Sequence, residues 1–302
     1  MVEIAICISS YNSSRFLNKC LSSLLNQSYS DFKIIFIDDC SIDDTKQIVG
    51  GFNDKRICYF RNEKNFGIAK SRNECLKHLK SERYVFFIDA DCYAERDWLK
   101  KGIEVFKNRD DIVCVNGKTI YVSENYNPGL SEKSHIQTDN WKSAYQTCNI
   151  AYRREVFDYL KFDEDSFNMM MEDTDFALQV MDKFPSGKFY SESKMRVVHQ
   201  KIYWSIQTFF RETEKVKYIV NLLKKYKVGN KNLPKEYQAK LLNKNYLFLA
   251  LFPPGIIYYI IKTKKRIRGL SDFLFMFLFI AKAYYYRYLV WKYALEAKVF
   301  IL

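Results

Sequence analysis

The chain has 302 residues, of which 48% are hydrophobic; this excludes an intrinsically disordered protein and allows one large domain or two smaller ones. The net charge of +13 is concentrated in residues 201–302, which hold 20 of the 48 Lys and Arg but only five of the 35 Asp and Glu. This basic third predicts a polyanionic partner, either nucleic acid or an anionic membrane surface.

Strand-like and helix-like segments alternate along the N-terminal part of the chain. Strands are predicted where apolar residues follow one another, at residues 3–10, 32–39, 57–62 and 83–91. Helices are predicted between them, at residues 16–27, 45–52 and 67–79. This alternation is typical of a doubly wound, mostly parallel α/β sheet. Nearly continuous apolar strands predict helices on both of its faces.

The character of the chain changes near residue 200. We therefore expect a catalytic domain at 1–200, followed by a basic, aromatic helical region at 201–302. Residues 203–226 predict an amphipathic basic helix, and two apolar stretches follow at 246–261 and 273–291. Both stretches are shorter than the roughly 20 apolar residues that a membrane span needs.

The C-terminal region is expected to lie on the cytoplasmic side of the cell membrane as a monotopic or peripheral element. Pro253 and Pro254 interrupt the first apolar stretch, and Lys282 stands in the middle of the second. A spanning pair would also place the basic segment at 262–268 outside the cell, against the positive-inside tendency. Two alternatives stay open: a two-helix transmembrane hairpin, and a soluble dimer or core region.

The eight cysteines form no CxxC pair, so the spacing typical of a structural zinc site is absent. Most of them stand in apolar stretches, as buried thiols do, and we expect a reducing cytosol without disulfides. The N-terminal residues "MVEIAICISSYN" become polar too soon for a secretory signal.

Polar side chains follow three of the predicted strands at the point where each strand ends. Ser9 stands at the end of the first strand, Tyr11 follows it, and Asp39 ends the second. Asp89 and Asp91, one residue apart, stand at the end of the fourth. Because ligands of such sheets bind at the carboxyl ends of the strands, these side chains are expected to share one site. The carboxylate pair is a candidate site for Mg²⁺ or Mn²⁺ bridging a diphosphate, since hard cations prefer carboxylate oxygens.

Five motifs stand in order along residues 3–200: "SSYN", "IDDCSIDDT", "NFGIAKSRN", "DAD" and "EDTDFALQV". In this order and spacing they resemble those of the family 2 glycosyltransferases, which have the type-A glycosyltransferase fold, a Rossmann-like α/β sheet. The resemblance implies an inverting, metal-dependent transfer of a sugar from a UDP- or GDP-linked donor to a hydroxyl group. The implied acceptor is a lipid-linked or cell-surface glycan.

The resemblance also implies roles on the nucleotide side of the site. Ser9 and Tyr11 would line the base pocket, with the Tyr11 ring stacking on the base. Asp39 would accept a hydrogen bond from the base, Arg72 would contact the diphosphate, and Asp89 would contact the ribose. Two other interpretations stay open, a helix-capping role for Asp39 and a solvated position for Arg72.

The metal and the catalytic base are expected at the other end of the donor. By resemblance Asp91 binds the metal together with His199, for which a purely structural role is the alternative. Asp173 is expected to take the proton of the acceptor hydroxyl, with Glu172 as the second choice. The same acidic residues would complement the dipole of a helix that begins there, which is compatible with catalysis.

Three further positions bear on the same loops. The family pattern usually has Gly where Cys40 stands, which leaves the shape of the loop after Asp39 undefined. Asp43 suits the cap of the helix at 45–52 better than Asp39 does. Cys92, directly after the aspartate pair, receives no role.

Two other classes of protein remain as alternatives. A nucleotidyltransferase acting on sugar phosphates also uses paired aspartates, but it releases diphosphate instead of a nucleoside diphosphate. A non-enzymatic nucleic-acid-binding protein would explain the basic third but not the acidic strand ends, so nucleic acid is not expected as a partner. The expected partners are a nucleotide-sugar donor, a glycan or lipid-linked acceptor and an anionic membrane surface, and a homo-oligomer is compatible with the sequence.

Overall fold

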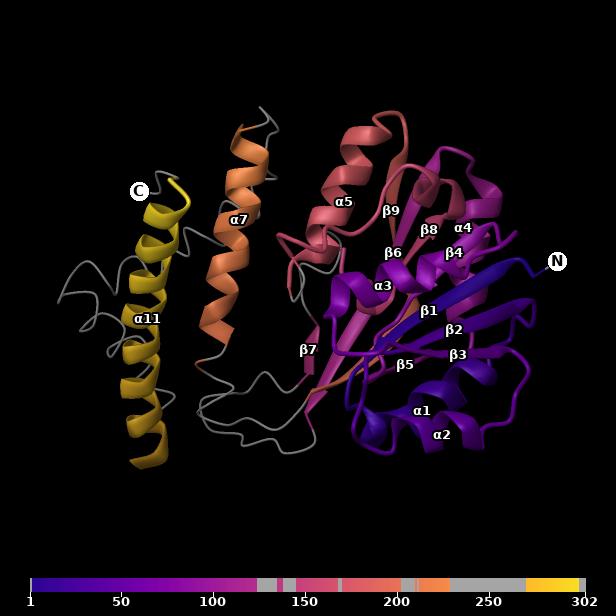
Figure 1. Ribbon diagram of the computed structural model, residues 1–302, viewed down its shortest axis with the longest axis horizontal. Coiled ribbons are helices and arrows are strands. Elements are labelled where there is room, and N and C mark those ends of the chain that lie inside the picture. The colour runs from indigo at the N-terminus through magenta and orange to yellow at the C-terminus, as the bar shows by residue number, and fades with distance from the viewer. Residues whose placement is uncertain are drawn as a thin grey trace. The chain divides into compact units, whose positions relative to one another are not determined.

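The computed structural model describes residues 2–123, 135–137, 145–167, 170–201, 210, 212–228 and 270–298 (Figure 1). The described residues fall into two compact units. The first holds strands β1 to β9 with helices α1 to α5, and the second holds α7 and α11.

The first part of the first unit alternates between strands and helices. Its elements are β1 (Ile4–Ser10), α1 (Ser14–Leu25), β2 (Phe32–Asp38), α2 (Thr45–Gly51), β3 (Ile57–Arg61), α3 (Ile68–Lys77) and β4 (Tyr84–Phe87). The four strands are hydrogen-bonded in the order β3-β2-β1-β4, and every pair among them is parallel. Each element overlaps a predicted segment, so the predicted doubly wound α/β sheet is confirmed.

The second part of this unit completes the sheet with shorter and partly antiparallel strands. Its elements are β5 (Cys92–Ala94), α4 (Trp98–Asn108), β6 (Ile112–Ser123), β7 (His135–Gln137), η2 (Thr147–Asn149), β8 (Ile150–Arg153), η3 (Arg154–Asp158), α5 (Glu172–Lys183) and β9 (Lys188–Lys201). The strand order continues β4-β8-β6-β9-β5, with β6 and β9 parallel and the other pairs antiparallel. The sequence analysis did not predict this mixed part, because β5 and β8 are too short to give an apolar pattern.

The core lies on both faces of the sheet, as the apolar strands predicted. Along β1, Ile4, Ile6 and Ile8 belong to one buried cluster, whereas Ala5 and Cys7 belong to another. Successive side chains of a strand point to opposite faces, so this alternation means that both faces are covered. Residues of α1 and α4 fill the first cluster, and residues of α3 and α5 fill the second.

The second unit consists of η4 (Glu212–Glu214), α7 (Lys215–Val228) and α11 (Leu270–Glu296). Helices α7 and α11 pack through Val216, Val220, Leu289 and Val290, which form a small apolar cluster. The predicted stretch at 273–291 lies inside α11, whereas the stretch at 246–261 and the basic segment lie outside the described residues. Among the helices that the structure describes, none combines the length and apolar character needed to cross a membrane.

Candidate active site

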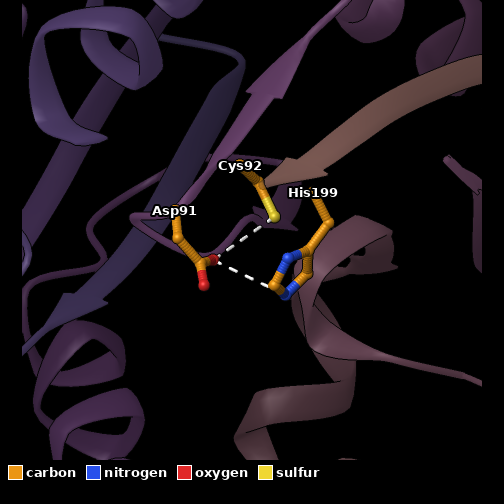
Figure 2. Close-up of side chains that lie close together, drawn as sticks. All are labelled: Asp91, Cys92 and His199. Carbon is orange, nitrogen blue, oxygen red and sulfur yellow. Dashed lines mark hydrogen bonds and ion pairs between the residues drawn. The ribbon is translucent and has the colours of Figure 1, made fainter. Parts of the chain in front are cut away.

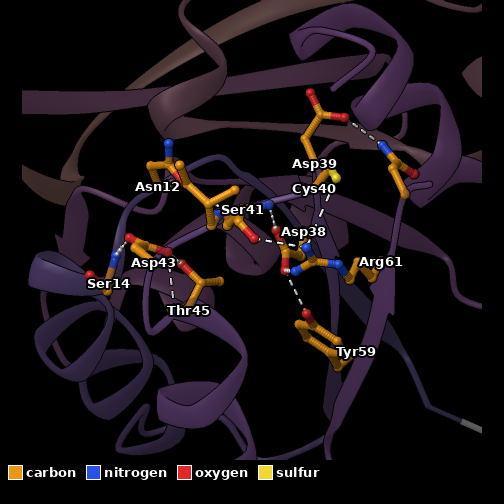
Figure 3. Close-up of polar contacts among 12 residues, drawn as sticks. Asn12, Ser14, Asp38, Asp39, Cys40, Ser41, Asp43, Thr45, Tyr59 and Arg61 are labelled. Atoms are coloured by element: carbon orange, nitrogen blue, oxygen red, sulfur yellow. Dashed lines mark hydrogen bonds and ion pairs between the residues drawn. The ribbon is translucent and has the colours of Figure 1, made fainter. Parts of the chain in front are cut away.

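The loops after β1 and β2 are tied together by short polar contacts at the carboxyl ends of the strands (Figure 3). Asn12 donates its backbone N–H to Ser41 Oγ at 2.9 Å. Asp43 accepts hydrogen bonds from the backbone N–H groups of Ser14 at 2.8 Å and Thr45 at 3.1 Å. These two groups begin α1 and α2, so Asp43 satisfies the first N–H of each helix, although the N-cap position of α2 is Asp44 and not Asp43 as expected.

Asp38, the last residue of β2, is fully buried and joins β2 to β3. It accepts hydrogen bonds from the Tyr59 hydroxyl at 2.5 Å, from Arg61 Nη1 at 2.8 Å and from the Ser41 N–H at 2.7 Å. Burial and the bond to Asp38 raise the pKa of Tyr59 to about 12. Because all three of these groups donate hydrogen bonds to Asp38, its buried charge is compensated. Asp38 therefore holds the loop after β2 in place.

Asp39 organises the loop that leads into α3. Its Oδ1 accepts from Asn62 Nδ2 at 2.7 Å and from the Phe66 N–H at 2.9 Å, and its Oδ2 accepts from the Gly67 N–H at 2.9 Å. Asn62 also donates to Ser71 Oγ at 3.1 Å, on the first turn of α3. The helix-capping alternative for Asp39 is therefore wrong. A carboxylate can accept about four hydrogen bonds, so the predicted contact with a base stays compatible with this network.

Cys40 follows with a φ of 65°, in the left-handed region that favours glycine. A side chain in this conformation costs roughly 1–2 kcal/mol. The loop thus keeps the backbone shape that a glycine would give, although this chain has a cysteine there.

Ser9 near the end of β1 pairs with Ile37 near the end of β2, and Tyr11 directly follows β1. Tyr11 is 49% exposed, which leaves its ring available for stacking on a ligand. The base-pocket roles of both residues remain predictions.

Arg72 is buried in α3 and contacts carboxylates from two distant parts of the chain. It donates from Nη2 to Asp89 Oδ1 at 3.1 Å, and from Nη1 to Glu172 Oε1. Burial lowers the pKa of Arg72, but the charges of Glu172 and Asp89 outweigh burial and raise it. The solvated position considered for Arg72 is therefore wrong, whereas its contact with a diphosphate remains a prediction.

Glu172 and Asp173 begin helix α5, directly after Met171 with a φ of 67°. Glu172 is 4% exposed and contacts Arg72, and its second oxygen is buried with no hydrogen-bond partner among the residues that the structure describes. Asp173 Oδ1 accepts from the Thr174 N–H at 2.6 Å. Burial and the charge of Glu172 raise the pKa of Asp173 to about 7. A general base works best with a pKa near the operating pH, so this geometry favours Asp173 over Glu172.

Asp91, just before β5, and His199 of β9 are brought together, as was expected of a metal site. His199 Nε2 lies 3.6 Å from Asp91 Oδ1. Burial and the charge of Asp89 raise the pKa of Asp91 to about 6, although His199 acts in the opposite direction. A pair of carboxylate and imidazole fits a divalent cation.

Cys92, for which no role was predicted from the sequence, lies beside this pair (Figure 2). Ligand atoms of Asp91, Cys92 and His199 all lie within 4.8 Å of one another. The grouping arises because Cys92 and His199 are paired across β5 and β9, which no local pattern in the sequence reveals.

Comparison with known proteins adds to this geometry. The family model for Glycosyl transferase family 2 matches residues 5–184. Escherichia coli WfaP, named as a UDP-Glc:alpha-D-GlcNAc-diphosphoundecaprenol beta-1,3-glucosyltransferase, is 30% identical over 166 residues, which are 52% of this chain and 61% of WfaP. The chain spans about half the length, or less, of the first curated relatives that it matches.

Two solved structures share the fold. The mannosyltransferase PcManGT from Pyrobaculum calidifontis, in complex with GDP-Man and Mn²⁺, has a TM-score of 0.63 at 15% identity and covers 98% of this chain and 86% of its own. Staphylococcus aureus TarS 1-349, in complex with UDP-GlcNAc, has a TM-score of 0.56 at 21% identity and covers 82% of this chain and 73% of its own. The family model spans the strand ends, the Arg72 network and the start of α5, and on this ground the chain belongs to glycosyl transferase family 2.

Proposed function

We propose that this protein is an inverting, metal-dependent glycosyltransferase that moves a sugar from a nucleotide diphosphate sugar to a hydroxyl of a lipid-linked or cell-surface glycan. The observation that carries the proposal is the placement of Asp173. It is a partly buried carboxylate with a pKa of about 7, and Arg72 joins its neighbour Glu172 to Asp89. The expected proton acceptor therefore stands next to a residue that Arg72 joins to Asp89, the aspartate expected at the ribose.

The acceptor hydroxyl attacks the anomeric carbon while the bond from that carbon to the diphosphate breaks. Asp173 takes the proton of the attacking hydroxyl, and the nucleoside diphosphate leaves with the electron pair. Attack from the side opposite to the leaving group inverts the anomeric configuration. Asp91 and His199 would hold Mn²⁺ or Mg²⁺, and a bound divalent cation neutralises the charge that develops on the leaving diphosphate.

The nucleotide is assigned to the loops after β1 and β2. Tyr11 stacks on the base, Ser9 lines the pocket, Asp39 accepts from the base, and Asp89 contacts the ribose. The structural neighbours support both donor series, since TarS is in complex with UDP-GlcNAc and PcManGT with GDP-Man. WfaP acts on a lipid-linked diphosphate, as its name states, which supports an acceptor of that class here.

The same proposal places the protein at the cytoplasmic side of an anionic membrane. Tyr284, Tyr288, Trp291 and Leu295 are exposed on α11 and recur every three or four residues, so they form one stripe. Aromatic side chains suit the headgroup layer, and the positive balance of residues 201–302 suits anionic lipid. The positive charge favours an anionic membrane over a second copy of the chain as the partner that covers the stripe.

Vesicle flotation tests the membrane assignment. We expect binding to vesicles that contain anionic lipid and little binding to neutral ones. Tyr288→Ser combined with Trp291→Ser should weaken binding, whereas Tyr159→Ser, an exposed tyrosine of the first unit, should not. Equal binding by all three proteins, or none by the wild type, would contradict the assignment, and a stripe-dependent dimer would point to self-association.

A thermal-shift panel tests the catalytic assignment. The full chain is heated with UDP- and GDP-sugars, with and without Mn²⁺ or Mg²⁺, and we expect one donor series to raise Tm when metal is present. No stabilisation by any donor would count against the proposal. Product analysis follows, because release of inorganic diphosphate instead of a nucleoside diphosphate would indicate a nucleotidyltransferase.

A further inference from the structure

Cys92 is the first residue of β5 and pairs directly with His199 of β9 in an antiparallel ladder. Directly opposite residues of such a ladder present their side chains on the same face of the sheet. Figure 2 shows the thiol and the imidazole turned toward Asp91. The His199 ring packs against the ring of Tyr121, with centroids 5.1 Å apart, and its Nδ1 is buried, so Nε2 is the nitrogen that faces Asp91.

The distances match a small tetrahedral site. Zinc binds sulfur at about 2.3 Å, carboxylate oxygen at about 2.1 Å and imidazole nitrogen at about 2.05 Å. Tetrahedral angles then separate sulfur from oxygen by about 3.6 Å and oxygen from nitrogen by about 3.4 Å. In this structure Cys92 Sγ and His199 Nε2 each lie 3.6 Å from Asp91 Oδ1. Three ligand atoms are therefore spaced for one ion with little movement of the backbone.

The set of donor atoms also selects among metals. Mg²⁺ and Mn²⁺ prefer oxygen ligands, whereas thiolate and imidazole favour softer ions such as zinc and cobalt. Three protein ligands leave the fourth position of a tetrahedral ion for a diphosphate oxygen, as in zinc sites that are not closed.

We propose that Cys92 is a third metal ligand, and that Asp91, Cys92 and His199 form a site that binds Zn²⁺ or Co²⁺ more tightly than Mn²⁺ or Mg²⁺. This inference refines the metal site of the proposed function, but it concerns ion binding in the absence of any donor. Binding of zinc by Cys92 can therefore be found even if no sugar transfer is detected, and it can be absent even if sugar transfer is detected.

Cobalt titration of the full chain tests the proposal, because a thiolate ligand gives Co²⁺ a charge-transfer band in the near ultraviolet. We expect this band in the wild type and its loss in Cys92→Ser. The variant should lose at least about tenfold in Zn²⁺ affinity, since even groups that only orient ligands contribute roughly 10–100-fold. Cys75→Ser is the matched control, because Cys75 is buried, its thiol contacts the carbonyls of Ile8 and Ile35, and it does not belong to the cluster of Asp91, Cys92 and His199.

X-ray absorption at the zinc edge of the wild-type protein covers the case in which Cys92→Ser fails to fold. A sulfur neighbour at about 2.3 Å is expected for one equivalent of Zn²⁺. A shell of nitrogen and oxygen alone, or a cobalt band that survives in Cys92→Ser and disappears in Cys75→Ser, would overturn the proposal.

Discussion

The Arg72 network gives the most direct test of the site's architecture. Replacing Arg72 with Met removes the guanidinium from two carboxylates, of which Glu172 is 4% exposed. Breaking a buried ion pair from one side costs about 3–5 kcal/mol, because the remaining charge stays buried without a partner. For a chain of this size we expect Tm to fall by roughly 6–15 °C.

The double variant Arg72→Met with Glu172→Gln separates loss of the ion pair from loss of packing. Glu172→Gln removes the stranded charge, whereas the Asp89 side chain is 30% exposed and stays in contact with solvent. We therefore expect the double variant to recover at least half of the lost free energy of unfolding, as complete replacement of a buried pair often does. Lys77→Met is the control on the same helix, since the exposed Lys77–Glu74 pair should contribute less than about 1 kcal/mol.

Equilibrium unfolding in urea, followed by far-ultraviolet circular dichroism, measures these free energies. The reasoning is refuted if Arg72→Met costs no more than Lys77→Met. It is refuted as well if the double variant is as unstable as the single one, because packing and not charge would then dominate.

Three further predictions concern the carboxylates and the base pocket. Asp173→Asn should keep donor-induced stabilisation but lose roughly 10²–10⁴-fold in turnover. Wild-type turnover should fall as the pH drops below about 7, because Asp173 then becomes protonated. A wild-type turnover that does not change over this pH range would exclude Asp173 as the base. Burial raises the pKa of Asp91 from 3.8 to about 6, so the folded protein binds more protons than the unfolded chain in that interval and loses stability as the pH rises through it. Asp91→Asn should then raise the free energy of unfolding of the metal-free protein at pH 8 by about 1–2 kcal/mol. The same variant should lose its stabilisation by Mn²⁺. A variant less stable than the wild type at pH 8 would contradict the expected direction of the effect. Tyr11→Ala should weaken donor binding by about 1–3 kcal/mol in a calorimetric titration without lowering Tm, since the ring is exposed; a drop in Tm would show a structural role instead.

The sequence predicted the parts of this protein whose signals are local. The strands β1 to β4 are mainly apolar, and the polar residues at the ends of β1, β2 and β4 mark the expected binding edge without reference to anything distant. Arg72 shows where local reasoning ends. Its sequence context predicted contact with a diphosphate and left a solvated position as the alternative, and only the return of the chain at Glu172 explains its burial. Cys92 is a second case, since its neighbour His199 comes from the far strand β9.

Electrostatic balance explains why the carboxylates of the site divide into two kinds. Asp89 and Glu172 share Arg72, the buried cation that the structure places between β4, α3 and α5. Asp91 and Asp173 have no guanidinium contact among the described residues, and these are the two whose pKa values rise, to about 6 and about 7. One of them faces His199, where a divalent cation would relieve the repulsion from Asp89. The other is the carboxylate proposed as the acceptor for a proton. Arg72 contacts only two of the four carboxylates, and the two that it does not contact are the ones proposed to bind the metal and to act as the base.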